Sequence, residues 1–191
     1  MNHKRRKFIK KIGRFLFAFL TISWKTVGKH ACKTGSDVEG PFYRGGAPRR
    51  FNIAQEYGES GDQLIVRGIV YGMDCSTPLE DVEVDIWHAS PNGVYDNTSK
   101  AFLFRGKTRT NVNGHYEFKT VLPGIYQSRP RHIHYKVRHA DYQELTTQLY
   151  FENDKYLKSD RTVRRNNGLS RTMGIENSDG GKVVTFDIYL S

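Results

Sequence analysis

The most regular feature of the sequence is an alternation of apolar and polar residues in short segments beyond residue 60. Gln63–Tyr71 (QLIVRGIVY) shows it most clearly and is rich in β-branched residues. Because successive side chains of a strand point to opposite faces, this period of two predicts strands. The same pattern predicts further strands at Asp81–Trp87, His115–Val121, His132–Val137, Leu145–Phe151 and Lys182–Leu190.

Turn-forming and polar segments separate these strands. Asp37–Arg50 is rich in Gly and Pro, Ala89–Lys100 is a long polar loop around Asn92-Gly93, and residues 152–181 are mostly polar and irregular. Short strands with turns between them, and no helical period after the N-terminal segment, predict an all-β fold. We expect one domain, residues 32–191, folded as a β-sandwich of mostly antiparallel strands with long active-site loops.

Charge is concentrated at the N-terminus. The chain carries a formal net charge of +10, but residues 1–31 hold nine Lys or Arg and no acid, so the remainder is nearly neutral. A nucleic-acid partner is therefore not expected. Lys4–Lys10 (KRRKFIK) followed by an apolar run, Phe15–Trp24, is typical of an export signal, and Arg5-Arg6 resembles the twin-arginine motif. We expect residues 1–31 to direct the protein to the periplasm or cell surface. The alternative is a basic amphipathic helix.

The chain has two cysteines, Cys32 and Cys75. They could pair as a disulfide in an oxidising compartment. Cys32 also follows Ala31 directly after the apolar run, as a lipid-modified cysteine would, although Lys29 does not fit a lipoprotein signal. A lipid anchor at Cys32, or the signal itself, would be the membrane contact. A free Cys32 is the third possibility, and the sequence leaves all three open.

The strongest candidate for chemistry is the stretch Tyr126–Tyr135 (YQSRPRHIHY). His132 and His134 are two residues apart on a predicted strand, so both imidazoles project from one face and could share a metal ion. Tyr126 and Tyr95 are candidate phenol ligands. A phenol, with an ordinary pKa near 10, is a poor ligand unless a strongly Lewis-acidic ion displaces its proton. Two phenolates with two imidazoles therefore favour Fe(III) over Zn(II).

These residues stand in a longer ordered set of motifs. The sequence resembles the intradiol ring-cleavage dioxygenases, close to the protocatechuate 3,4-dioxygenase type, over nearly all of the expected mature chain. The motifs are Glu39–Tyr43, Pro78-Leu79, Val84–Ala89, Gly93-Val94-Tyr95, Arg105-Gly106, Gly114–Phe118, Pro123–Tyr126, Arg129–His134 and Thr147–Phe151.

The resemblance implies the chemistry of the site. It implies a non-haem Fe(III) bound by Tyr95, Tyr126, His132 and His134, and a catechol or protocatechuate-like substrate cleaved with O2 to a muconate-type diacid. Tyr95 would be the ligand that leaves when substrate chelates the iron, and it would take up a substrate proton. Arg129 would stabilise negative charge on the ring. Gln148 would be a polar residue of the pocket.

Two rival functions remain. A non-catalytic, prealbumin-like β-sandwich binding module shares the strand and Pro-Gly-x-Tyr patterns, but it does not need the His-x-His pair with two spaced tyrosines. A zinc hydrolase using the histidine pair lacks an obvious third ligand and general base. The substrate end of the pocket, which includes the candidates Pro41, Phe42, Tyr43 and Arg131, does not disclose the specific catechol. A homo-oligomer is possible, and the sequence does not fix it.

Overall fold

The computed structural model describes residues 32–54, 61–179 and 181–191. The segment that the sequence predicts as an export signal, residues 1–31, lies outside these ranges. The described elements are β1 (Gln63–Tyr71), β2 (Glu83–Trp87), β3 (Arg105–Arg109), β4 (His115–Val121), β5 (His132–His139), β6 (Tyr142–Phe151), α1 (Arg161–Arg165), the 3-10 turn η2 (Gly168–Arg171), β7 (Thr172–Met173), β8 (Glu176–Ser178), β9 (Gly181–Thr185) and β10 (Ile188–Tyr189). None of the described helices is long and apolar enough to cross a membrane.

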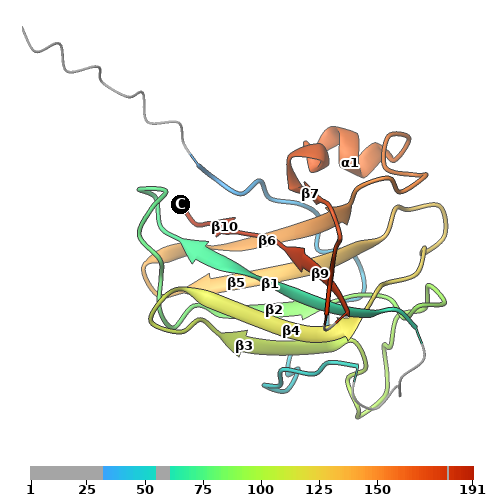
Figure 1. Cartoon of the computed structure of the whole chain (residues 1–191), viewed down its shortest axis with the longest axis horizontal. Helices are drawn as coiled ribbons and strands as arrows, with labels where there is room; N and C mark the ends of the chain where they lie inside the picture. The colour runs from blue at the N-terminus through green and yellow to red at the C-terminus, as the bar shows by residue number, and fades with distance from the viewer. Residues whose placement is uncertain (1–31, 55–60, 180) are drawn as a thin grey trace, which may run out of the picture. The chain divides into compact units, whose positions relative to one another are not determined.

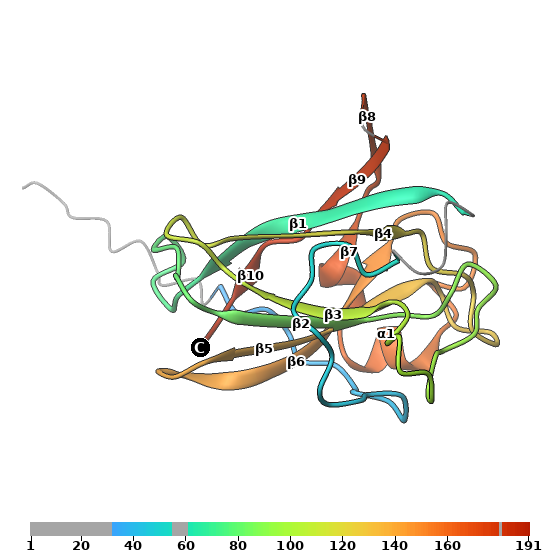
Figure 2. The same ribbon diagram turned by 90° about the horizontal axis from the view of Figure 1, so that it is seen from below.

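The described strands form two five-stranded sheets that lie one above the other (Figures 1 and 2). The first has the order β10-β1-β9-β8, with β4 also paired to β1, and the second has the order β3-β2-β5-β6-β7. Five of the pairings among described strands are antiparallel, and β1–β9, β1–β10 and β6–β7 are parallel. The predicted all-β sandwich of mostly antiparallel strands is confirmed.

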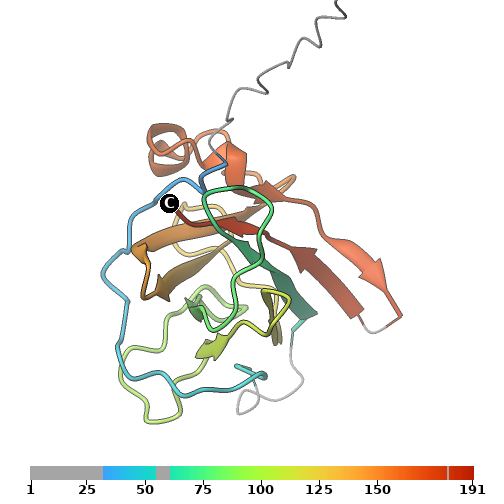
Figure 3. The same ribbon diagram turned by 90° about the vertical axis from the view of Figure 1, so that its left-hand side faces the viewer.

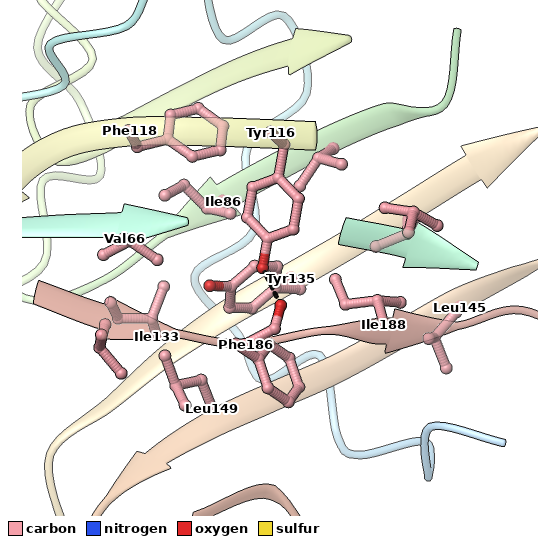
Figure 4. Close-up of a cluster of buried hydrophobic side chains, with 14 of the residues drawn as sticks. Val66, Ile86, Tyr116, Phe118, Ile133, Tyr135, Leu145, Leu149, Phe186 and Ile188 are labelled. Carbon is pink, nitrogen blue, oxygen red and sulfur yellow. Dashed lines mark hydrogen bonds between the residues drawn. The ribbon is translucent and has the colours of Figure 1, made fainter. Parts of the chain in front are cut away.

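The main hydrophobic core fills the space between the two sheets (Figure 4). Alternate side chains of each central strand point into this core. Examples are Val66 of β1, Phe118 of β4, and Ile133 and Tyr135 of β5. These four side chains are almost completely buried. Alternation along β5 therefore sends Ile133 and Tyr135 into this core and leaves the opposite face of the strand for other contacts.

The strand prediction was wrong at one segment and incomplete at two others. The expected strand Lys182–Leu190 is broken into β9 and β10. At the break, the Asp187 carboxylate accepts a hydrogen bond from Ile69 N at 2.9 Å. In a continuous strand, a backbone carbonyl would have accepted this hydrogen bond. Tyr116 on β4 donates to the carbonyl of Phe186 at the same break, at 2.5 Å (Figure 4). The second difference is β3, whose polar sequence RGKTR has no apolar alternation and which forms by pairing with β2. The third is residues 152–181, where the short elements α1, η2, β7 and β8 lie between irregular segments.

The N-terminal part of the described chain covers the outer face of the second sheet. It runs along the outside of the sandwich (Figure 3). It is held to β6 by hydrogen bonds from Asp37 N to Thr146 O (2.9 Å) and from Gln148 Nε2 to Val38 O (2.7 Å). This cover makes β5 buried on both faces for most of its length. A site on the outer face is thereby shielded from bulk water.

A disulfide joins Cys32 to Cys75. It ties the start of this covering segment to the turn after β1. The sequence leaves Cys32 open to be disulfide-bonded, lipid-modified or free, and the structure has the disulfide. A lipid thioether would need the same sulfur atom.

Candidate metal centre

The second sheet aligns the side chains of the candidate site in neighbouring rows. On its outer face, Trp87 of β2 is opposite His134 of β5, and His134 is opposite Gln148 of β6. His132 is opposite Tyr150 in the next row on the same face. Directly opposed residues in an antiparallel pair have their side chains in contact. The sequence prediction that both histidines project from one face of a strand is therefore confirmed by the register.

Tyr95 brings its hydroxyl oxygen onto both histidines. This oxygen lies 3.1 Å from His132 Nε2 and 3.1 Å from His134 Nε2. All three side chains are at least nine-tenths buried. Tyr95 belongs to the Ala89–Lys100 loop, whose Ser90-to-Val94 turn carries it over the sheet through bonds such as Ser90 N to Val94 O at 2.8 Å. The loop and strand β5 thus place three donor atoms around one point.

The His132 ring is fixed in one tautomer. Its Nδ1 lies 2.7 Å from the carbonyl oxygen of Pro130, which can only accept, so Nδ1 carries the hydrogen and Nε2 presents a lone pair. Such a carbonyl contact is the usual orienting partner of a metal-binding histidine. Burial lowers the pKa of His132 to about 4, with a further contribution from the nearby positive charge of Arg129. The ring is therefore neutral and ready to act as a ligand at pH 7.

His134 is held differently. Its Nδ1 is buried without a hydrogen-bond partner among the described residues. The ring instead stacks on Trp87, with centroids 4.7 Å apart and planes only 7° from parallel. Burial lowers the pKa of His134 well below its ordinary value, and the neighbouring His132 lowers it further. Trp87 therefore lies against this candidate ligand and fixes the plane of its ring.

Tyr126 lies next to these three side chains but is less enclosed. Its ring centroid is 5.4 Å from that of Tyr95, and its hydroxyl accepts a hydrogen bond from Gln127 Nε2 at 3.0 Å. Phe42 packs against both rings, stacked on Tyr95 at 4.4 Å and edge-on to Tyr126 at 5.2 Å. The four predicted ligand residues are therefore neighbours, with Tyr126 at the outer side of the cluster.

Arg129 and Gln148 also meet at the site. Arg129 Nη2 donates to Gln148 Oε1 at 3.3 Å and to the Tyr150 hydroxyl at 3.1 Å. Its Nε donates to Asp160 Oδ2 at 3.2 Å, and Asp160 also caps the N-terminus of α1 through Val163 N. Gln148 is completely buried, so its amide is a fixed partner of Arg129.

One residue that holds the site together is not predicted as a site residue from sequence. Arg105 is almost completely buried and donates to Phe42 O at 2.6 Å and to Asp96 O at 2.9 Å. It therefore ties the segment before Tyr43 to the loop that carries Tyr95. Burial lowers its pKa to about 10, which still leaves it charged at pH 7. Its place in the Arg105-Gly106 motif is the signal that could have suggested this role.

The candidates for the substrate end of the pocket separate in the structure. Phe42 lies against Tyr95, as described above. Tyr43 instead donates to Asp85 Oδ2 at 3.1 Å, and Arg131 pairs with Asp154 at 3.1 Å, so both are engaged in contacts of their own. His88 is engaged elsewhere, since its ring nitrogens lie 2.7 Å from Thr120 Oγ1 and 2.7 Å from the Ala89 carbonyl oxygen.

The donor set fits ferric iron better than zinc. Two neutral imidazole nitrogens converge on one phenol oxygen, with a second phenol beside it. Burial raises the pKa of the Tyr95 phenol well above its ordinary value, so only a strongly Lewis-acidic ion would hold it as phenolate. Among the described residues, no group of three or more His, Cys, Asp or Glu could hold a metal, which removes the usual ligand sets of a zinc hydrolase from that part of the chain.

Comparison with known proteins gives the family. A family model described as Dioxygenase matches residues 38–191. Together with catechol-cleaving relatives, this match shows that the chain belongs to the intradiol ring-cleavage dioxygenases. It is 31% identical over 176 residues to chlorocatechol 1,2-dioxygenase of Pseudomonas putida, covering 80% of this chain and 66% of that protein. It is 33% identical over 159 residues to catechol 1,2-dioxygenase 2 of Acinetobacter lwoffii, covering 71% and 58%.

A solved structure extends the comparison to the fold. The dioxygenase domain of a dioxygenase carbohydrate-binding protein fusion from Streptomyces sp. SirexAA-E superposes with a TM-score of 0.75 and 33% identity, over 83% of this chain and 98% of that domain. The chain spans 66% or less of the length of the two catechol-cleaving relatives named above. The closer likeness to the protocatechuate type stays a prediction.

Proposed function

We propose that this protein is a non-haem Fe(III) intradiol dioxygenase that cleaves a catechol-type ring with O2 to a muconate-type diacid. The observation that carries the proposal is the convergence of the Tyr95 hydroxyl on the Nε2 atoms of His132 and His134, at 3.1 Å each. Family membership and the names of the relatives support the same reaction. A prealbumin-like binding module would not need this buried set of donors.

Four side chains would hold the metal, namely Tyr95, Tyr126, His132 and His134. The chemistry that ferric iron supplies when bound is chelation of both catechol oxygens and activation of the ring toward O2. His132 and His134 are neutral ligands whose ring planes are fixed, one by the Pro130 carbonyl and one by stacking on Trp87.

Tyr95 has the position and the basicity to take up a substrate proton. Its oxygen faces both histidines, so a catechol hydroxyl bound at these donors would lie beside it. Because burial raises the pKa of its phenol, a Tyr95 phenolate would be a strong base in this environment. The catechol proton would therefore end on the Tyr95 oxygen.

Arg129 would stabilise the negative charge that develops on the ring. Its guanidinium is fixed by the Gln148 side-chain oxygen, the Tyr150 hydroxyl and the Asp160 carboxylate. A donor held in place before the reaction costs no reorganisation when charge appears. Gln148 orients this guanidinium and is itself fixed by its bond to Val38 O.

The test is turnover of catechol under isotopic oxygen. Iron-loaded protein is expected to convert catechol under 18O2 to a diacid that carries two 18O atoms, one in each new carboxyl group. The matched variant His132→Ala is expected to bind less iron and to lose turnover. Recovery of unchanged catechol, or of a product with a single 18O atom, would reject the intradiol assignment.

We also propose export to an oxidising compartment. The Cys32–Cys75 disulfide supports it, because such bonds persist outside the reducing cytoplasm. Fractionation of cells that express the full chain, with a disulfide assay on the recovered protein, tests it. Reduced protein confined to the cytoplasm would refute it.

A further inference from the structure

An arginine-lined cavity lies at the α1 helix. It has a volume of about 720 Å³ and is lined by Val38, Arg161, Thr162, Arg164, Arg165 and Asn166. Three of these six residues are arginines, and all three are exposed. Figure 1 shows the α1 helix that carries them beyond β6 and close to β7.

The acids on this side of the molecule are already occupied. The buried Asp160 carboxylate caps α1 and pairs with Arg129, and Asp154 pairs with Arg131. Asp37, which precedes Val38, accepts hydrogen bonds from Arg171, Tyr150 and Asn166.

None of these acids is free to neutralise the cavity. Within the described chain, Arg161, Arg164 and Arg165 form no ion pair. The positive charge that lines the cavity is therefore uncompensated by neighbouring side chains.

The placement of these arginines is unfavourable for α1 on its own. Arg161 lies in the first turn, where a cation opposes the helix dipole, and no acid occupies that turn. Arg161 and Arg165 are also four residues apart, a spacing at which like charges destabilise a helix. Arg164 and Arg165 suit the last turn, and an anion bound by the group of three would offset their charge. Planar guanidinium groups bind carboxylates with paired hydrogen bonds.

Two contacts connect the cavity to the site. Val38 lines the cavity, and its carbonyl accepts from Gln148, the residue opposite His134. Asp160 caps the arginine helix and also binds Arg129. Val38 therefore connects the cavity to Gln148, and Asp160 connects α1 to Arg129.

We propose that the cavity is a carboxylate-binding subsite of the enzyme, with Arg161, Arg164 and Arg165 as its anion-binding groups. The proposal rests on the proposed function for the origin of the carboxylate. That carboxylate is either an acidic substituent of the catechol substrate or one of the two carboxylates of the ring-opened product. In both cases the guanidinium groups form charge-assisted hydrogen bonds to the carboxylate oxygens.

The experiment compares wild type, Arg164→Gln/Arg165→Gln, and the control Arg67→Gln, which removes an exposed cation from β1 on the other sheet. Calorimetry at low salt measures the binding of benzoate and of adipate, a saturated analogue of the diacid. Steady-state kinetics measures the ratio of kcat/KM for protocatechuate to that for catechol. Loss of a charged hydrogen-bond pair is expected to weaken carboxylate binding about tenfold in the double variant, while the control matches wild type.

The outcomes distinguish the two sources. A fall of about tenfold in the protocatechuate-to-catechol ratio, together with weaker benzoate binding, identifies a substrate carboxylate. Weaker adipate binding with an unchanged ratio identifies the product. Unaltered binding of both carboxylates in the double variant, or an equal loss in Arg67→Gln, overturns the subsite. Because calorimetry needs no turnover, the subsite is decided even if no form of the protein cleaves a catechol.

Discussion

Replacing both Cys32 and Cys75 by serine would remove the covalent link between the start of the described chain and the turn after β1. The two cysteines are 43 residues apart in sequence. For a closed loop of this length, the chain-entropy model gives a stabilisation of about 4 kcal/mol at 25 °C. Thr34 keeps its own bonds to Tyr189, at 3.1 and 2.8 Å, so the covering segment stays docked in the native state. The loss is therefore expected to act mainly through the unfolded chain.

Urea unfolding of the oxidised wild type, the reduced wild type and the double serine variant measures this effect. With an urea m-value of about 2 kcal/mol/M, the midpoint is expected to fall by about 2 M on reduction or substitution. The reduced wild type and the double variant are matched controls for each other, since both lack the bond. Equal urea midpoints in the oxidised and reduced proteins would show that the disulfide does not stabilise the folded protein.

Two further predictions concern residues around the metal centre. Trp87→Leu is expected to lower iron affinity by about 10- to 100-fold because His134 loses the stack that fixes its plane, whereas Trp87→Phe keeps a flat ring and most of the affinity. Competition with an iron chelator measures this, and equal affinities in the two variants would show that the stack does not position the ligand. Burial lowers the pKa of His88 to about 4, so the unfolded chain binds its proton first as pH falls below about 6.5. The contribution of His88 to the free energy of unfolding is therefore present above pH 6.5 and is lost as the pH falls toward 4. Between pH 7.5 and pH 5 the expected loss is about 2 kcal/mol. Urea unfolding at both pH values should show this loss reduced in His88→Gln, and an unchanged pH dependence in that variant would contradict the assignment.

The strands that follow local rules could be predicted from the sequence. The bounds of β1 and β4 match the alternating segments Gln63–Tyr71 and His115–Val121. The shared face of His132 and His134 follows from the same period of two. In each case the apolar residues that define the pattern are those that the core buries.

Other elements depend on contacts that are distant in sequence. The RGKTR segment of β3 carries no apolar pattern, and its pairing with β2 makes it a strand. The five residues of α1 are stabilised by the Asp160 cap, and that carboxylate is fixed in turn by Arg129. Local propensity does not reveal such ties.

The candidate site shows the same division. Tyr95, Tyr126, His132 and His134 could be named from their motifs, and the structure makes them neighbours. The stack of Trp87 on His134 could not be foreseen, because it depends on the register of β2 against β5. The role of Arg105 likewise depends on two carbonyl groups from separate loops.

The most direct test of the central claim is the visible spectrum of the iron-loaded protein, recorded without oxygen before and after addition of catechol. Phenolate ligands to ferric iron are expected to give a strong visible charge-transfer band that shifts when catechol binds. Tyr95→Phe and Tyr126→Phe should each weaken the band, while the control Tyr71→Phe, which alters a tyrosine stacked on Tyr189, should leave it unchanged. A protein that takes up Fe(III) yet stays colourless, or a band that survives both ligand substitutions, would contradict the assignment of Tyr95 and Tyr126 as ligands.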